Sequence, residues 1–203
     1  MGHGWPVIFC GIAVAATICI GGCANAQRYR GLDLTTTRPS SLIAVPAAAQ
    51  NGRNDCGYAA LASVALYHRA AASRLVEGEV PQSFRGERLA AADLVKMAAK
   101  LELKAFGYQG SVDDLRENVG KGRPVLVLLS QPPRVEPRTF FDFAGDFASA
   151  GFVIPHWVVV CGFTADDRVV VHDPRNGLIT MGLRDFTQLW ERTSRVAVLV
   201  VRE

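Results

Sequence analysis

The sequence changes character at Gly122, and this change constrains the fold more than any other feature. Before Gly122, Ala-rich and amphipathic stretches predict helices over about 56–69 and about 89–101, and Ser111 begins a capping-box sequence that predicts a third helix. After Gly122, short apolar runs rich in β-branched residues predict strands. These runs are 124–129, 157–161, 168–172 and 196–201. A helical half followed by a strand-rich half is typical of an α+β protein.

Short connections between the predicted strands favour antiparallel pairing. Residues 165–167, of sequence Ala-Asp-Asp, separate two of the apolar runs, and Asn176-Gly177 follows the second of them. Both are connections of the hairpin type. We therefore expect the middle strands to form an antiparallel sheet, with the amino-terminal helices packed on it.

Composition limits the class of protein. The chain has 203 residues, of which 49% are hydrophobic and 20% charged, so it can bury one globular core and is not intrinsically disordered. Its formal net charge is +3 without a basic block, which argues against nucleic acid as a partner. The sequence contains no CxxC pair, so the paired spacing of a structural zinc site is absent. We expect no metal and no cofactor.

The amino terminus is predicted to be an export signal. Residues 7–22 carry no charge and are shorter than the roughly 20 apolar residues that span a bilayer. The sequence Ile-Gly-Gly-Cys at 20–23 resembles a bacterial lipobox, in which Cys23 becomes the lipid-bearing first residue. Alternatively, Ala-Asn-Ala at 24–26 fits the small-x-small pattern that would release a soluble periplasmic product. A buried amino-terminal helix is disfavoured because the stretch lacks a polar face.

These features divide the chain into three predicted parts. Residues 1–22 form the signal peptide, and residues 23–43, polar and rich in Thr, Arg and Ser, form a flexible tether. Residues 44–203 form the folded domain. Ala24 follows the lipobox cysteine, and in the lipoproteins that this segment resembles a non-Asp residue there goes with the outer membrane. We therefore expect an outer-membrane lipoprotein that faces the oxidising periplasm.

Cys56 is the first candidate for chemistry. It is the first residue of a predicted helix, and we expect the preceding Asn54 and Asp55 to cap that helix. Backbone N–H groups and the helix dipole favour a thiolate in such a place. Gly57 has no side chain, so we expect room for a substrate beside the sulfur. Taken alone, a cysteine at a helix start is more often an inert small hydrophobe.

His156 and Asp173 strengthen the catalytic interpretation. His156 opens one predicted strand after Pro155, and Asp173 closes the next strand before Pro174, across a hairpin. Adjacent antiparallel strands can bring two such residues together. His156 would then take the proton from Cys56 while Asp173 orients the imidazole, which is the nucleophile, base and orienter arrangement of many hydrolases.

Together these motifs resemble the bacteriocin-processing, double-glycine-leader cysteine peptidases of the papain-like superfamily. The resemblance covers about 44–201, nearly the whole predicted domain. It rests on Gln50 six residues before Cys56, the triplet Asp-Cys-Gly at 55–57, the strand His-Trp-Val-Val-Val at 156–160, and Val-His-Asp-Pro at 171–174 followed by Gly177.

The resemblance implies a papain-like fold, a peptide or protein substrate, and roles for four residues. Cys56 would be the nucleophile, His156 the general base and acid, and Asp173 the orienting residue. Gln50 would supply an oxyanion donor beside a backbone N–H near Cys56. A zinc hydrolase built on Cys56, His156 and Asp173 is disfavoured, because it would leave Gln50 without a role.

The sequence also departs from that family. The best-known members are amino-terminal domains of ABC transporters, whereas this sequence has neither a transmembrane bundle nor a GxxxxGK[ST] phosphate loop. We therefore expect a stand-alone exported thiol peptidase that cuts a secreted or surface-assembled polypeptide, after small residues such as Gly, beside an export or fibre-assembly system. Two other functions stay open: a non-hydrolytic peptide-binding module, and an acyl transferase that uses the same triad.

Two regions outside this set carry separate predictions. The Phe-rich segment 131–154 is long for a loop in a compact domain, so it would cover the cleft, dock a partner, or pack on the core as a flap. Cys161 is predicted to be a buried core thiol. Strand alternation puts Cys161 on the face opposite to His156, so we expect it to point away from Cys56.

Overall fold

The computed structural model describes residues 41–50, 52, 54–69, 88–131 and 154–202. The predicted signal peptide, the lipidation site Cys23 and all but the last residues of the predicted tether lie outside these residues. Most of the Phe-rich segment also lies outside them. Within the described residues, no helix has both the length and the apolar character needed to cross a bilayer.

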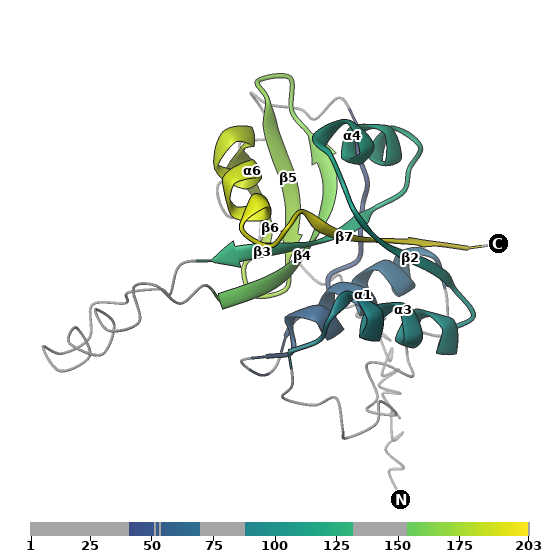
Figure 1. Ribbon diagram of the computed structural model, residues 1–203. Coiled ribbons are helices and arrows are strands. Elements are labelled where there is room, and N and C mark those ends of the chain that lie inside the picture. The colour runs from purple at the N-terminus through teal and green to yellow at the C-terminus, as the bar shows by residue number, and fades with distance from the viewer. Residues whose placement is uncertain (1–40, 51, 53, 70–87, 132–153, 203) are drawn as a thin grey trace, which may run out of the picture.

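A seven-stranded antiparallel sheet forms the centre of the described structure (Figure 1). Its main path runs in the order β2-β7-β3-β4-β5-β6, and the short β1 pairs with β4 off this path. The strands are β1 (Ser41–Leu42), β2 (Lys104–Gln109), β3 (Val125–Gln131), β4 (Ile154–Phe163), β5 (Arg168–Asp173), β6 (Gly177–Gly182) and β7 (Val196–Val201). The predicted α+β class with an antiparallel sheet is confirmed.

Helices pack against this sheet. They are α1 (Cys56–Tyr67), α3 (Ala91–Lys100), α4 (Val112–Gly120) and α6 (Leu183–Glu191). Helices α1 and α3 contact each other, and they contact β4 and β2 respectively. Figure 1 shows these two helices together below the sheet, whereas α4 and α6 lie in the upper part of the view, on either side of β5. The three predicted helices therefore form within a few residues of their expected bounds.

Helix α6 and strand β6 were not predicted from the sequence. A signal for α6 was available, since Leu183, Phe186 and Trp190 recur at the i, i+3, i+7 spacing of an amphipathic helix. Phe186 and Trp190 are fully buried. Strand β6 is half-exposed along most of its length, and its burial gives it no clear apolar alternation.

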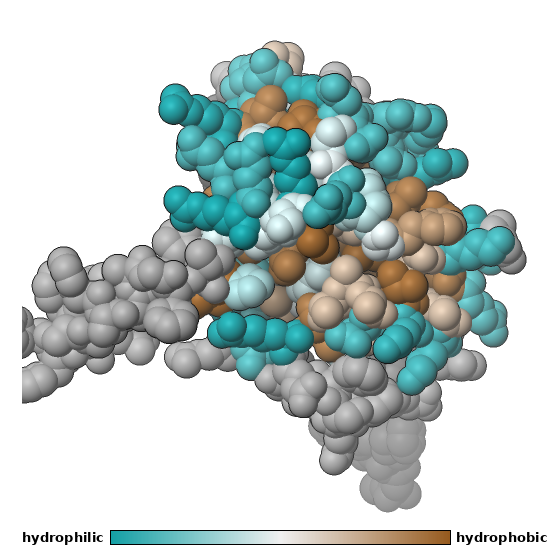
Figure 2. All heavy atoms as spheres, viewed as in Figure 1, coloured by the Kyte–Doolittle hydropathy of each residue, from teal (hydrophilic) through white to brown (hydrophobic). Residues whose placement is uncertain are grey.

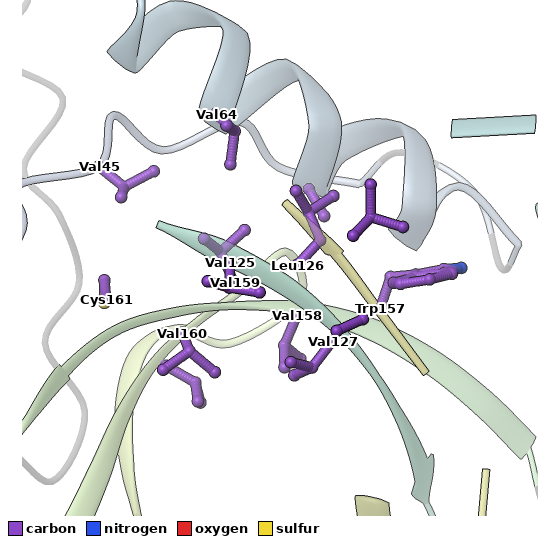
Figure 3. Close-up of a cluster of buried hydrophobic side chains, with 14 of the residues drawn as sticks. Val45, Val64, Val125, Leu126, Val127, Trp157, Val158, Val159, Val160 and Cys161 are labelled. Atoms are coloured by element: carbon purple, nitrogen blue, oxygen red, sulfur yellow. The ribbon is translucent and has the colours of Figure 1, made fainter. Parts of the chain in front are cut away.

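Burial on both faces explains the unbroken apolar run in β4. Trp157 and Val159 point toward helix α1, whereas Val158 and Val160 point to the opposite side (Figure 3). All four side chains are at most 2% exposed. A strand covered on both faces has no polar alternation, which is why this segment reads as continuously hydrophobic. Strand β4 is thereby a rigid support for His156, which lies near its start.

The start of α1 departs from the predicted capping. Asp55 occupies the N-cap position, but its side chain makes no hydrogen bond to the helix. Its carboxylate lies over Gly52 instead, where an added Cβ would be 2.6 Å from Oδ2. The predicted Asp55 side-chain cap is therefore wrong. The Gly57 N–H of the first turn is hydrogen-bonded to the Cys56 sulfur.

The sheet includes residues of the predicted tether. Ser41 and Leu42 pair with β4, and Ile43 is buried while its N–H donates to the Cys161 carbonyl over 2.8 Å. The described fold thus takes in three residues on the amino-terminal side of the expected boundary at 44.

Large apolar side chains reach the surface at a few places. Figure 2 shows hydrophilic side chains over much of the visible face, interrupted by hydrophobic ones. Among the described residues, the exposed large hydrophobic side chains are Leu42, Phe106 and Ile154. Of these three side chains, Ile154 is two residues before His156 in the sequence.

The capping box of α4 gives a direct test of the fold. Ser111 Oγ accepts the Asp114 N–H over 3.1 Å, and Asp114 Oδ2 accepts the Ser111 N–H over 2.7 Å. Ser111→Ala should lower the free energy of unfolding by about 1 kcal/mol, because it leaves a backbone donor of the first turn without its partner. Ser111→Thr keeps the hydroxyl and should stay close to wild type. Urea unfolding measures both, and an equal loss in the two variants would contradict the capping role.

Candidate active site

The register of the sheet brings His156 and Asp173 together. Val159 pairs with His172, so the next step of the ladder sets Asp173 opposite Val158. His156 lies two residues farther along the same face of β4, which makes it the diagonal neighbour of Asp173. The His156 Nε2 atom lies 3.0 Å from Asp173 Oδ1, and both side chains are almost fully buried.

Cys56 completes a hydrogen-bonded series with these two residues. Its thiol is hydrogen-bonded to the His156 side chain. Because Nε2 of the ring is taken by Asp173, the nitrogen that faces the sulfur is Nδ1. The predicted sulfur, imidazole and carboxylate thus form one hydrogen-bonded series, and Cys56 and His156 are each at most 8% exposed.

The end of β5 makes space for the sulfur. Pairing between β4 and β5 stops at Val159 and His172, so it does not reach Trp157. The Trp157 N–H is instead hydrogen-bonded to the Cys56 sulfur, as is the Gly57 N–H. The nucleophile candidate therefore sits at the end of the sheet, against an edge of β4 that strand β5 does not cover.

Charge pairing outweighs burial at the sulfur and the ring. Burial by itself raises the pKa of the Cys56 thiol, but hydrogen bonds from His156 and Trp157, with the positive charge of His156, lower it below its ordinary value. Burial likewise lowers the pKa of His156, but hydrogen bonds and negative charges from Asp173 and Cys56 raise it to about 9. The two groups titrate as a coupled pair, and both pKa shifts favour its thiolate–imidazolium form over the neutral form.

Asp173 is held ionised by the turn that follows it. Its Oδ1 accepts the backbone N–H groups of Arg175 and Asn176 over 2.7 and 3.2 Å, and its Oδ2 accepts Asn176 Nδ2 over 2.8 Å. Burial raises the pKa of this carboxyl, but His156 and these donors together hold it well below its usual range. A buried carboxylate with this many donors is a fixed acceptor for the imidazole.

Gln50 links the turn after Asp173 to the loop before Cys56. Its backbone N–H donates to the Pro174 carbonyl over 3.1 Å, one residue beyond Asp173. Its Nε2 donates to the Gly52 carbonyl over 2.9 Å, in the loop that leads to Cys56. The amide nitrogen carries a second hydrogen besides the one on Gly52. Gln50 is thus anchored both to the turn after β5 and to the loop before α1.

The expectation that Gly57 leaves room for a substrate is wrong. A Cβ on Gly57 would lie 2.9 Å from Cδ1 of Trp157 and 3.3 Å from the Cβ of Leu89. The protein itself fills this space. Gly57 is required because two other segments approach the helix closely there.

Cys161 is a buried thiol, as expected, but the face of β4 on which it lies is not what separates it from Cys56. It is fully buried, and its Sγ donates to the Val170 carbonyl over 3.5 Å. Burial raises its pKa to about 12. The face opposite to His156 is the one that meets α1, because Trp157 lies on it and contacts the helix beside Cys56. What separates Cys161 from the site is roughly 16 Å of strand, at about 3.3 Å per residue.

Two residues of the site, Trp157 and Asn176, were not predicted from the sequence. Trp157 was treated only as a strand residue, and Asn176 only as a turn residue. A signal for Asn176 existed, because an Asn three residues after an Asp can donate back to that carboxylate within one turn. No signal in a single strand could have indicated the contacts of Trp157, since they join segments far apart in the sequence.

Solved structures share this fold. A protein described as a C39-like peptidase from Bacillus anthracis matches with a TM-score of 0.58 and 17% identity over 80% of this chain and 98% of its own. The peptidase domain of Streptococcus ComA, a bifunctional ABC transporter of a quorum-sensing pathway, matches with a TM-score of 0.54 and 19% identity over 80% and 98%. A double-glycine motif protease from an AMS/PCAT transporter, in complex with its leader peptide, matches with a TM-score of 0.52 and 17% identity over 82% and 98%.

The match to a family model is more specific than these structural likenesses. No curated protein sequence matches the chain. The model of the Peptidase_C39 like family, however, matches residues 42–198, which include the whole described site. The chain therefore belongs to the Peptidase_C39 like family, and it is a cysteine peptidase.

Proposed function

We propose that Cys56, His156 and Asp173 form the catalytic triad of an exported thiol peptidase that hydrolyses a peptide bond in a secreted or surface-assembled polypeptide. One observation carries this proposal: the unbroken hydrogen-bonded series from the sulfur through the imidazole to a buried carboxylate. The shifted pKa values of the sulfur and the ring agree with it, because both shifts favour the reactive thiolate.

The chemistry follows from the contacts of the ring. His156 Nδ1 takes the thiol proton, and the thiolate attacks the carbonyl carbon of the scissile bond to form a tetrahedral oxyanion. The imidazolium then gives that proton to the leaving amine, which departs and leaves a thioester on Cys56. His156 next activates a water molecule, whose attack releases the acid and restores the thiol. Asp173 holds the ring in one orientation throughout and stabilises its charged form.

Gln50 is the proposed side-chain donor to the oxyanion. Its anchors on Pro174 and Gly52 support this role, because they fix an amide nitrogen between the turn after Asp173 and the loop before Cys56. Backbone N–H at the start of α1 would supply the second donor. Such a donor acts only on charge that develops in the transition state, and its loss typically costs about 2.7–4 kcal/mol.

The proposed substrate is a peptide cut after small residues such as Gly. The double-glycine motif protease that shares this fold is in complex with a leader peptide, which supports a peptide as the substrate class of this protein. The amino-terminal sequence supports export and a lipid anchor at Cys23 on the outer membrane, and we propose an export or fibre-assembly system as the partner. A peptide-binding module without hydrolysis and an acyl transferase remain the alternatives that the tests below separate.

Cleavage of Gly-containing peptides tests the proposed function. The full chain, incubated with synthetic peptides that carry a Gly-Gly pair before the scissile bond, should give the two hydrolysis products by mass spectrometry. Cys56→Ala should lower the rate on the order of 10⁴-fold or more, because it removes the nucleophile. Cys161→Ala, which removes the other cysteine of the described residues, should keep the rate within a few fold.

The products also separate the alternatives. Transfer of the acyl group to an added amine, with no acid product, would identify an acyl transferase. Tight binding of the peptides without any product in wild type would favour the binding module.

The pH dependence of cleavage should be bell-shaped. The rate rises with pH as the thiol ionises, and this limb lies below the ordinary range of a thiol because the pKa of Cys56 is lowered. The rate falls as pH passes about 9, where His156 loses the proton that the leaving amine needs. Values of kcat/KM, obtained from initial rates over a pH series, measure both limbs. A single rising limb with the midpoint of an ordinary thiol, about pH 8.5, would contradict the ion pair.

Asn176 should affect turnover through Asp173. Asn176→Ala removes the Nδ2 donor on Asp173 Oδ2, so the carboxylate is less well fixed as the partner of His156. We expect kcat to fall about tenfold with KM unchanged, since a hydrogen bond to a charged group is worth about 1.5–3 kcal/mol. Asn118→Ala is the matched control, because its Nδ2 donates to the Asp114 carbonyl over 2.9 Å in α4. Equal kcat in the two variants would show that Asn176 only stabilises the turn.

A further inference from the structure

The indole of Trp157 joins two parts of the molecule at the active site. The side chain is 2% exposed, and its Nε1 donates to the Leu89 carbonyl over 2.8 Å. Leu89 stands directly before Ala90, the N-cap residue of α3. The indole therefore links β4, at the residue directly after His156, to the segment that leads into helix α3.

The same indole supports the helix that carries the sulfur. An added Cβ on Gly57 would meet Trp157 Cδ1 at 2.9 Å, which is closer than real Cβ contacts are found. The edge of the ring thus rests against the backbone of α1 at the residue directly after Cys56. The depth to which the start of α1 can approach the sheet is set by this contact.

The backbone of Trp157 contacts the sulfur as well. Its N–H is hydrogen-bonded to the Cys56 sulfur, and the preceding residue supplies the imidazole. The ring that rests on α1, the N–H that meets the sulfur and the imidazole thus come from two consecutive residues of β4. The ring is held from both sides, by Gly57 and by the Leu89 carbonyl, so it has little freedom to move.

We propose, on the basis of the function proposed above, that Trp157 is a positioning residue whose wedged indole sets the separation between the Cys56 sulfur and the His156 ring. It does not take part in the chemical steps. It acts by fixing α1 against β4 at the point where nucleophile and base meet. Gly57 is the complementary half of this device, because only a residue without a side chain lets the ring fit.

Alkylation of Cys56 tests this role without a substrate. The full chain is treated with iodoacetamide over a pH series, and modification of the Cys56 peptide is followed by mass spectrometry. Trp157→Phe keeps an aromatic ring but loses the Nε1 donor, and Gly57→Ala pushes against the ring from the other side. At about pH 6, each variant should lower the Cys56 alkylation rate on the order of tenfold, because a misplaced imidazole stabilises the thiolate less. On cleavable peptides, each should lower kcat with KM unchanged.

The chain provides matched controls remote from the sulfur. Trp190 is fully buried in α6, and its Nε1 donates to the Val196 carbonyl over 2.9 Å. A Cβ on Gly110 would meet Trp190 Cη2 at 3.0 Å. Trp190→Phe and Gly110→Ala therefore impose the same kind of loss and the same kind of clash elsewhere, and they should leave Cys56 alkylation within about twofold of wild type.

The outcomes separate this inference from the proposed function. If Trp157→Phe and Gly57→Ala react like their controls while wild-type Cys56 reacts as an activated thiolate, the positioning role is overturned and the peptidase proposal stands. If wild-type Cys56 reacts no faster than in the denatured chain, the peptidase proposal itself fails. Should Trp157→Phe not fold, Gly57→Ala decides, because Ala is the better helix former and its only penalty is the contact with the ring and Leu89.

Discussion

Strand β5 stops pairing with β4 at Val159, and the candidate site depends on that early end. Pro174 follows Asp173 directly, and a proline has no N–H with which to continue a ladder. The Trp157 N–H, which a longer β5 could have occupied, is hydrogen-bonded to the Cys56 sulfur instead. The proline after the orienting carboxylate thus cannot extend the ladder, and the edge of β4 is left to the nucleophile.

Burial makes the three ionisable side chains depend on one another. Each of them, taken alone, would lose its charge when removed from water. Together, the thiolate and the carboxylate flank one imidazolium, and the turn donors satisfy the remaining lone pairs of Asp173. Removing one member of such a set leaves a buried charge without its partner, which is far more costly than the net gain from the intact set. This coupling explains why a fully hydrogen-bonded series, rather than a looser cluster, is found here.

Patterns within one segment predicted much of this structure. The apolar runs gave β3, β4, β5 and β7, the capping box gave the start of α4, and hairpin connections gave the antiparallel sense of the middle strands. Contacts between distant segments could not be predicted in the same way. Gly57 suggested space for a substrate, but the space belongs to Trp157 and Leu89, which the sequence places about 100 and about 30 residues away. Asp55 had the right residue type for a cap, yet its side chain makes no cap hydrogen bond and its carboxylate lies against Gly52.

A second histidine shows how strongly strand alternation governs the chemistry. His172 precedes Asp173 on β5, so its ring points to the opposite face of the sheet from the carboxylate. It is 1% exposed, and neither ring nitrogen has a hydrogen-bond partner in the described structure. Burial therefore lowers its pKa, although Asp173 is its neighbour in sequence, whereas the pKa of His156, whose ring meets Asp173 directly, is raised. Both are buried histidines on the central strands of one sheet. Only the one whose side chain shares a face with the carboxylate can carry the positive charge that a thiolate requires, so a one-residue slip of β5 against β4 would abolish the site without changing its composition.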